Sequence, residues 1–124
     1  MADKENKMII SSDGTVSYSN DVVATIAGLA AIGVDGVAGM SGGIASGISE
    51  FLGKKDFTKG VRVEQEGDTT ILDLNVVIRY GVQMHSVCRQ VQEQVQKEIE
   101  NMTSLKLGAV NVHVVGIDMT EDQQ

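Results

Sequence analysis

The chain has 124 residues, with ten basic and seventeen acidic side chains and a net charge of −7. This balance excludes the clustered basic surface of a typical nucleic-acid-binding protein. Aromatic residues make up only 3% of the chain and proline is absent, which argues against a binding groove built on aromatic stacking.

The single cysteine, Cys88, cannot form an intramolecular disulfide. Because the sequence also shows no signal peptide, we expect a reducing cytoplasm as its location. The longest uncharged run, residues 22–34, falls short of the ~20 residues of a membrane-spanning helix. We therefore expect a chain that does not cross a bilayer by itself.

The chain is expected to hold one domain, residues 8–118, between a flexible N-terminal arm (1–7) and an acidic flexible tail (119–124). Residues 9–18 predict one or two short strands around the turn signal Asp13-Gly14. Ser19 is a plausible N-cap for a helix that ends near Ile32, with Asp21 in its first turn.

Two faces of this first helix differ in the size of their side chains. The apolar stripe of Val22, Ile26 and Leu29 is expected to cover the sheet. The opposite side is small and uncharged, whereas a solvated helix face is normally polar. This side is the candidate interaction face, Ala24, Ala27, Gly28 and Ala31. It is expected to contact the 44–52 segment, a second subunit or a partner; the alternative is a row of exposed alanines.

The glycine-rich stretch at residues 33–55 does not have the spacing of a phosphate-binding loop. Five residues separate Gly47 from Gly53, and Lys54 is followed by lysine rather than serine or threonine. Glycines two apart, as in a dinucleotide fingerprint, are missing from it as well. A connector with tight turns and a short strand around Val37 is the preferred interpretation.

A weak amphipathic helix is predicted after this strand, with apolar residues at i, i+4, i+7 and i+8. With the lysines that follow, it forms a candidate contact for a partner or a membrane surface, namely Ile44, Ile48, Phe51, Leu52, Lys54 and Lys55. The alternative for the lysines is a solvated loop.

The second half of the chain predicts a hairpin, a helix and a last strand. A strand at residues 61–66 and the turn Gly67-Asp68 precede a strand in which Leu72, Leu74, Val76, Ile78 and Tyr80 share one face. The longest helix runs from about Met84 to Met102, with an apolar stripe of Met84, Val87, Cys88, Val91, Val95, Ile99 and Met102. The last strand, residues 109–117, points Val110, Val112 and Val114 inward and Asn111 and His113 outward.

Each strand therefore has one apolar face and both long helices are amphipathic. This pattern predicts an α+β two-layer sandwich, with two main helices on one face of a mainly antiparallel sheet.

Candidate chemistry is sparse. Cys88 and His85 are three residues apart on the long helix, but zinc needs three or four ligands and a third is not evident. Cys88 is better read as a small core residue. Glu64 and Asp73 are expected near each other on the solvent side of the hairpin, where nothing raises a carboxyl pKa for acid catalysis. We expect no catalytic residue, metal or cofactor.

Five stretches, taken in order, resemble the alkaline-shock, Gls-type general-stress family of bacterial envelope-stress proteins. They are "GTVSYSNDVVATIAG", "GVDGVAGM", "FTKGVRVEQEGDTTILDLNVVIRYG", "VCRQVQEQVQKEIENMTSL" and "AVNVHVVGI". Ser104 departs from the family pattern, which usually carries glycine in a Met-Thr-Gly-Leu motif at the end of the long helix.

The resemblance implies a short, single-domain cytoplasmic protein of Gram-positive bacteria that supports envelope homeostasis without catalysis. It implies protein partners, self-association and, in some members, attachment to the membrane through a separate membrane-spanning protein. Members of the short branch are often encoded beside a dihydroxyacetone-kinase-like fatty-acid kinase. The alternative function is therefore a small-ligand or enzyme-accessory protein linked to such a kinase.

Overall fold

The computed structural model describes residues 14–40 and 58–120. The elements in chain order are α2 (Asn20–Ile32), β1 (Val37–Met40), β2 (Val61–Glu66), β3 (Thr69–Arg79), α4 (Met84–Met102) and β4 (Leu107–Asp118). Residues 14–19 contain neither helix nor strand, so the prediction of a strand within residues 14–18 is wrong. The rest of that region lies outside the described residues.

The sheet is organised around β3, which alternates strictly between buried and partly exposed residues. On one side, β2 pairs antiparallel with the first half of β3, placing Val61 opposite Leu74. β1 pairs antiparallel with the second half, with Val37 opposite Ile78. On the other side β4 runs parallel to β3, as the crossover through α4 requires. Two of the three pairings in the described sheet are therefore antiparallel.

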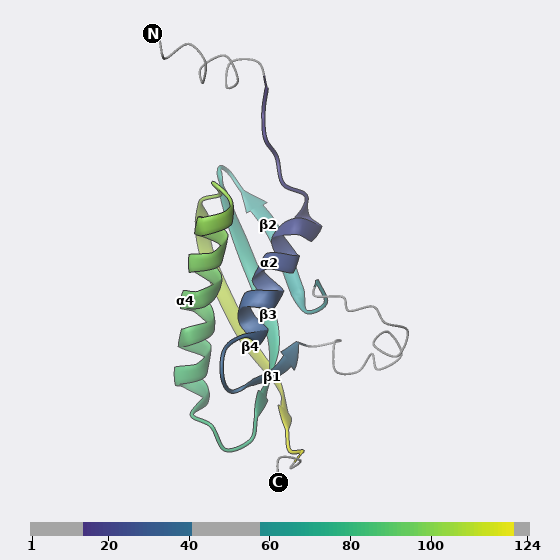
Figure 1. Cartoon of the computed structure of the whole chain (residues 1–124), viewed down its shortest axis with the longest axis vertical. Coiled ribbons are helices and arrows are strands. Elements are labelled where there is room, and N and C mark those ends of the chain that lie inside the picture. Colours follow the sequence, from purple (N-terminus) through teal and green to yellow (C-terminus); the bar gives the residue numbers. More distant parts are fainter. Residues whose placement is uncertain (1–13, 41–57, 121–124) are drawn as a thin grey trace.

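Both helices lie on the same side of the sheet (Figure 1). The core between the two layers combines large side chains from the sheet with a valine and isoleucine stripe from α4. Its fully buried large side chains from β3 and α4 are Leu72, Leu74, Val76, Ile78, Val91, Val95 and Ile99. The predicted α+β two-layer sandwich is confirmed.

The helix ends follow local side-chain chemistry. Ser19 caps α2, where its hydroxyl oxygen accepts a hydrogen bond from the Val22 amide at 3.2 Å. At the end of α4, the Thr103 hydroxyl donates to the Ile99 carbonyl at 2.7 Å and accepts from the Leu105 amide at 3.1 Å. Thr103 has an extended backbone, and Ser104 does not have a positive φ. This helix end therefore does not need the left-handed glycine at position 104.

The predicted orientation of α2 is wrong. Ala27 and Ala31 are completely buried and belong to the core, and Ala24 and Gly28 are buried as well. Val22 and Leu29, expected to face the sheet, are 47% and 46% exposed. The large side chains of β3 already fill the interlayer space, so the helix packs with its small residues inward. A helix with small inward residues can approach its neighbours closely.

Smaller corrections concern the ends of elements. Tyr80, predicted to point inward, lies beyond the end of β3 and is 68% exposed. Met84 and Met102 belong to the first and last turns of α4 and are exposed rather than core residues. Val114 is also exposed, because it lies on the edge strand β4 next to a register shift opposite Val76 and Val77.

Candidate functional site

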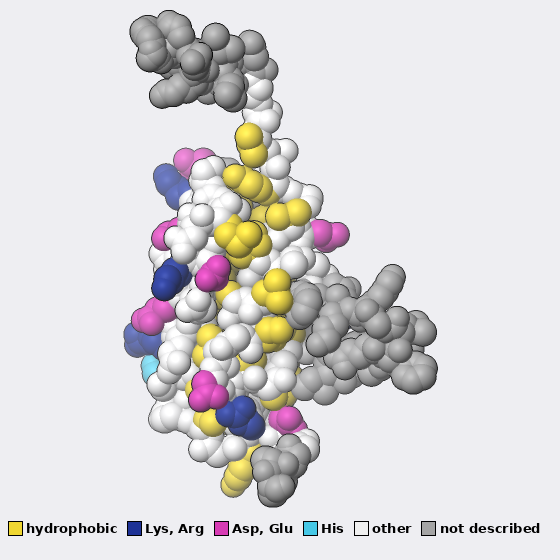
Figure 2. All heavy atoms as spheres, in the orientation of Figure 1, with side chains coloured by type: hydrophobic (Ala, Val, Ile, Leu, Met, Phe, Trp, Pro, Cys, Tyr) yellow, Lys and Arg dark blue, Asp and Glu magenta, His cyan; other side chains and the backbone are white. Residues whose placement is uncertain are grey.

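The outer face of α2 carries aliphatic side chains where a solvated helix would be polar. Val22, Leu29 and Ile32 are exposed, and Ile26 is half-buried between them. Figure 2 shows hydrophobic side chains gathered along this helix and toward α4. We call this surface, Val22, Ile26, Leu29 and Ile32, the outer α2 face.

A groove with a volume of about 690 Å³ separates the outer α2 face from α4. It is lined from the side of α2 by Thr25, Ile26, Leu29, Ala30, Gly33, Val34 and Asp35, and from α4 by Gln90, Glu93, Gln94, Glu98 and Met102. Its aliphatic wall comes from α2 and its polar wall mostly from α4. We call it the α2–α4 groove.

The groove is acidic. Three of its described lining residues carry carboxylates, and no Lys, Arg or His is among those described lining residues. Gln94 donates a hydrogen bond to Glu98 at 3.2 Å, which leaves the carboxylate charge intact. Asp35 Oδ1 forms an exposed ion pair with Arg79 Nη2 at 3.4 Å. The net charge that the groove presents therefore comes mainly from Glu93 and Glu98.

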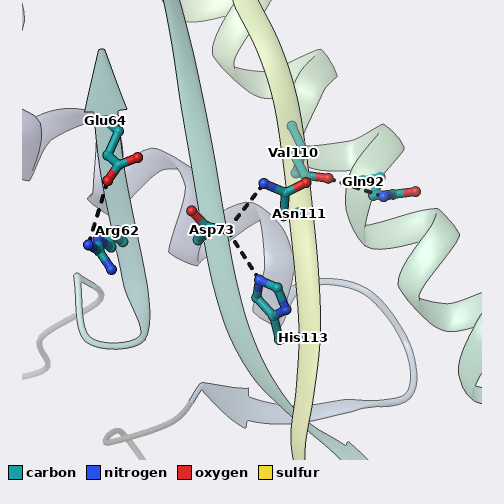
Figure 3. Close-up of polar contacts among 7 residues, drawn as sticks. All are labelled: Arg62, Glu64, Asp73, Gln92, Val110, Asn111 and His113. Carbon is teal, nitrogen blue, oxygen red and sulfur yellow. Dashed lines mark hydrogen bonds and ion pairs between the residues drawn. The ribbon is translucent and has the colours of Figure 1, made fainter. Parts of the chain in front are cut away.

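A separate polar cluster lies on the face of the sheet that the helices do not cover (Figure 3). Asp73 Oδ1 on β3 accepts a hydrogen bond from Asn111 Nδ2 at 3.2 Å and lies 3.1 Å from His113 Nε2, both on β4. In the β2–β3 register Asp73 is opposite Arg62, whereas Glu64 is opposite Ile71. Glu64 pairs with Arg62 at 3.5 Å. It is a diagonal neighbour of Asp73 on the same face of the hairpin, as expected.

The hydrogen bond with His113 is the largest effect that holds the pKa of the Asp73 carboxyl below its ordinary value. Asn111 and the charges of His113 and Arg62 act in the same direction, and partial burial opposes them. A carboxyl with a lowered folded-state pKa stabilises the fold above its unfolded-state pKa, about 3.9. This stabilisation disappears as the pH falls through the folded-state value.

We expect Asp73→Asn to melt at a lower temperature than the wild type at pH 5–7, with the difference shrinking below about pH 4. Thermal unfolding followed by circular dichroism between pH 2.5 and 7 measures this. Glu93→Gln, which removes an exposed carboxylate on α4, is the control and should show no such convergence. A difference between Asp73→Asn and wild type that stays constant down to pH 2.5 would contradict the role of the cluster.

Cys88 is half-buried beside the core, and His85 is exposed one turn earlier. Burial raises the pKa of the Cys88 thiol. The described residues contain no group of three His, Cys, Asp or Glu side chains that could hold a metal ion. The interpretation of Cys88 as a packing residue is consistent with its contacts to the core.

We expect Cys88 to react slowly with a thiol reagent at pH 7.5 and at least tenfold faster in denaturant, because its thiolate is disfavoured and partly covered. Timed labelling with and without guanidinium chloride measures both rates. Equal rates in the two conditions would place the thiol on the surface.

The second predicted contact surface lies outside the described residues. It comprises Ile44, Ile48, Phe51, Leu52, Lys54 and Lys55, and it stays a prediction. Also, no helix within residues 14–40 and 58–120 combines the length and apolar character that a membrane crossing needs.

The fold and these surfaces define a small α+β protein with one open sheet face and an exposed aliphatic helix face. Residues 8–119 match the model of the alkaline-shock protein 23 family, which is described by a cell envelope-related function. The chain belongs to this family, and a cell envelope-related role follows from that membership.

Relatives support the assignment over most of the chain. The uncharacterized protein YqhY of Bacillus subtilis is 40% identical over 111 residues, which cover 90% of this chain and 82% of YqhY. YloU of the same organism is 34% identical, over 86% of this chain and 91% of YloU. A stress response regulator gls24 homolog of Streptococcus pyogenes is 31% identical over 87% of this chain, which spans 61% of that protein.

Solved structures with the same fold are more distant. A cadmium form of a MamM CTD variant superposes with a TM-score of 0.54 and 16% identity, over 83% of this chain and 100% of that chain. A nickel form gives a TM-score of 0.53 and 17% identity, over 77% and 96%. Identities this low show a likeness of fold alone.

Proposed function

We propose that this protein is a non-enzymatic interaction protein of the Gram-positive cell-envelope stress response. It acts in the cytoplasm through protein–protein contacts and is held at the inner face of the membrane by a membrane-anchored partner. The family supports the envelope role, and the gls24 homolog of Streptococcus pyogenes supports the link to stress.

The observation that carries the proposal is the outer α2 face. Val22 and Leu29 leave nearly half of their surface exposed on one helix, beside a groove that offers further apolar area. Contiguous exposed aliphatic surface is costly in water, and it commonly marks a site where another molecule binds. By contrast, Asp73 and His113 lie on the open sheet face, without the burial that tunes groups for acid–base catalysis.

A second candidate function is that of a small-ligand or accessory protein for a neighbouring dihydroxyacetone-kinase-like fatty-acid kinase. The volume of the α2–α4 groove favours it, because ~690 Å³ lies within the ~300–1,000 Å³ of typical ligand pockets. A groove that binds a small ligand would give a thermal shift with fatty acids, whereas a groove that binds only protein would not.

The test is partner capture with the full chain from separated membrane and cytosol fractions of Bacillus subtilis. Wild-type protein should recover a membrane protein, and the matched variant Leu29→Ser should recover at least fivefold less of that same protein. Recovery of a metabolic kinase alone, equally by both proteins, would contradict the proposal and support the second candidate.

A further inference from the structure

We propose that the α2–α4 groove binds a short, positively charged amphipathic helix of a partner protein. This inference rests on the proposed function, since it assigns the surface and the chemistry of the partner. Three properties of the groove carry it: the aliphatic wall on one side, the carboxylates on the other, and its length along α4.

The aliphatic wall suits the apolar face of a helix. Ile26 and Leu29 are one turn apart on α2, and Met102 extends the apolar surface at the end of α4. Leu29 is 46% exposed, so an occupant that covers it removes aliphatic surface from water. Ridges of side chains spaced one turn apart are the surface into which a helix packs.

The polar wall selects the charge of the occupant. Glu93 and Glu98 lie on α4, and Asp35 lines the groove beyond the C-terminal end of α2, near Arg79. A neutral helix would leave Glu93 and Glu98 without a cationic partner, and an acidic helix would repel them. Lysine or arginine at the edges of an apolar face would pair with them. Charge complementarity of this kind sets both partner choice and association rate.

The length of the groove limits the size of the occupant. From Gln90 to Met102 it follows α4 for roughly 18 Å, the rise of about twelve helical residues. An occupant of about three turns would fill it. A helix of that length exposes three or four aliphatic positions on one face, which matches the extent of the wall on α2.

The binding test uses a fluorescent synthetic helix of about fourteen residues, with leucine on one face and lysine at its edges. The control peptide keeps the leucine face and replaces every lysine with glutamate. Titration with the full chain, followed by fluorescence anisotropy at 50 mM salt, should show binding at least tenfold tighter for the lysine peptide. Equal binding of the two peptides would overturn the charge assignment.

Matched variants place the binding site. Leu29→Ser should weaken binding of the lysine peptide about tenfold, whereas Val22→Ser, at 47% exposure on the same helix but outside the groove lining, should change it less than about twofold. Glu98→Lys should weaken it about tenfold. Glu100→Lys is the matched control, because it changes the net charge by the same amount at a position outside the groove lining. Like Glu98, Glu100 accepts a hydrogen bond from the glutamine four residues earlier. It should therefore have little effect.

Equal losses in Glu98→Lys and Glu100→Lys would show a non-specific charge effect and overturn the proposal. A second result would also overturn the proposal: the wild type self-associates in sedimentation, Leu29→Ser does not, and the lysine peptide does not bind. The occupant of the groove would then be a second copy of this chain. If membrane-partner capture persists in Leu29→Ser and Glu98→Lys, the outer α2 face and the groove are both wrong as the binding site, while a membrane-anchored partner that binds elsewhere is still supported. If the wild-type protein captures no membrane protein at all, the proposed function is contradicted instead.

Discussion

Ala31→Glu and Ala27→Lys are expected to destabilise the protein by about 4 kcal/mol or more, because each places an unpaired charge in the core. Both alanines are 0% exposed and lie among the apolar side chains of the two layers. For a domain of this size such a loss is a large part of the total stability. Urea denaturation followed by circular dichroism at 25 °C measures the free energy of unfolding.

The matched controls put the same charges on the outer α2 face. Leu29→Glu and Val22→Lys should each cost less than about 1 kcal/mol, since their side chains are already half in solvent. The reverse order, with the alanine variants stable and the Leu29 and Val22 variants unfolded, would show that α2 packs with its large residues inward. The outer α2 face and the groove assignment would then both be wrong.

Gly36→Ala is the second substitution with a large expected effect, about 2–4 kcal/mol of lost stability. Gly36 has a φ of 105°, in a region that L side chains rarely adopt. An added Cβ would also lie 2.8 Å from Cγ2 of Val87, a buried residue of α4. The turn between α2 and β1 therefore packs against α4 only because it has no side chain at this position.

Two comparisons separate the backbone strain from the steric clash. Gly81 has a φ of 99°, but an added Cβ there would meet nothing within 4 Å, so Gly81→Ala should cost only about 1–2 kcal/mol. In the Val87→Ala background the clash is removed, and Gly36→Ala should then cost about as much as Gly81→Ala. Equal costs of Gly36→Ala and Gly81→Ala in the wild-type background would contradict the close approach of the turn to α4.

The elements with a polar face were predictable. α4 carries glutamine and glutamate on every side except one, so its valine and isoleucine stripe had a single possible orientation. From Leu72 to Val76, β3 alternates between apolar and polar residues, which fixes its buried face in the same way. These two patterns were enough to predict the two layers and the fold class.

The orientation of α2 was not predictable by the same rule. Beyond its first turn the helix contains a single polar residue, Thr25, so no polar face marks the solvent side. Val23, Ala27, Ala30 and Val34 form a second stripe at helical spacing, with smaller residues than Val22, Ile26 and Leu29. Size favoured the wrong stripe, because the sequence alone does not show how much of the interlayer space β3 already fills.

The groove was missed for a related reason. Glu98 and Met102 read as ordinary members of a polar face and a helix end, and they become significant only as part of the groove wall across from α2. That juxtaposition depends on the packing of α2 against α4, two elements far apart in the chain. The Asp73 cluster likewise depends on the parallel register of β3 and β4, which places Asn111 directly opposite Asp73.

The most direct test of the proposed function is photo-crosslinking in living cells from single positions of the full chain. A photoreactive residue at Leu29 samples the α2–α4 groove, whereas one at Arg62 samples the open face of the sheet, where the side chain is 70% exposed. We predict an adduct with a membrane protein from position 29 and none from position 62. A membrane-protein adduct from position 62 alone, or an adduct from position 29 with a soluble kinase alone, would contradict it.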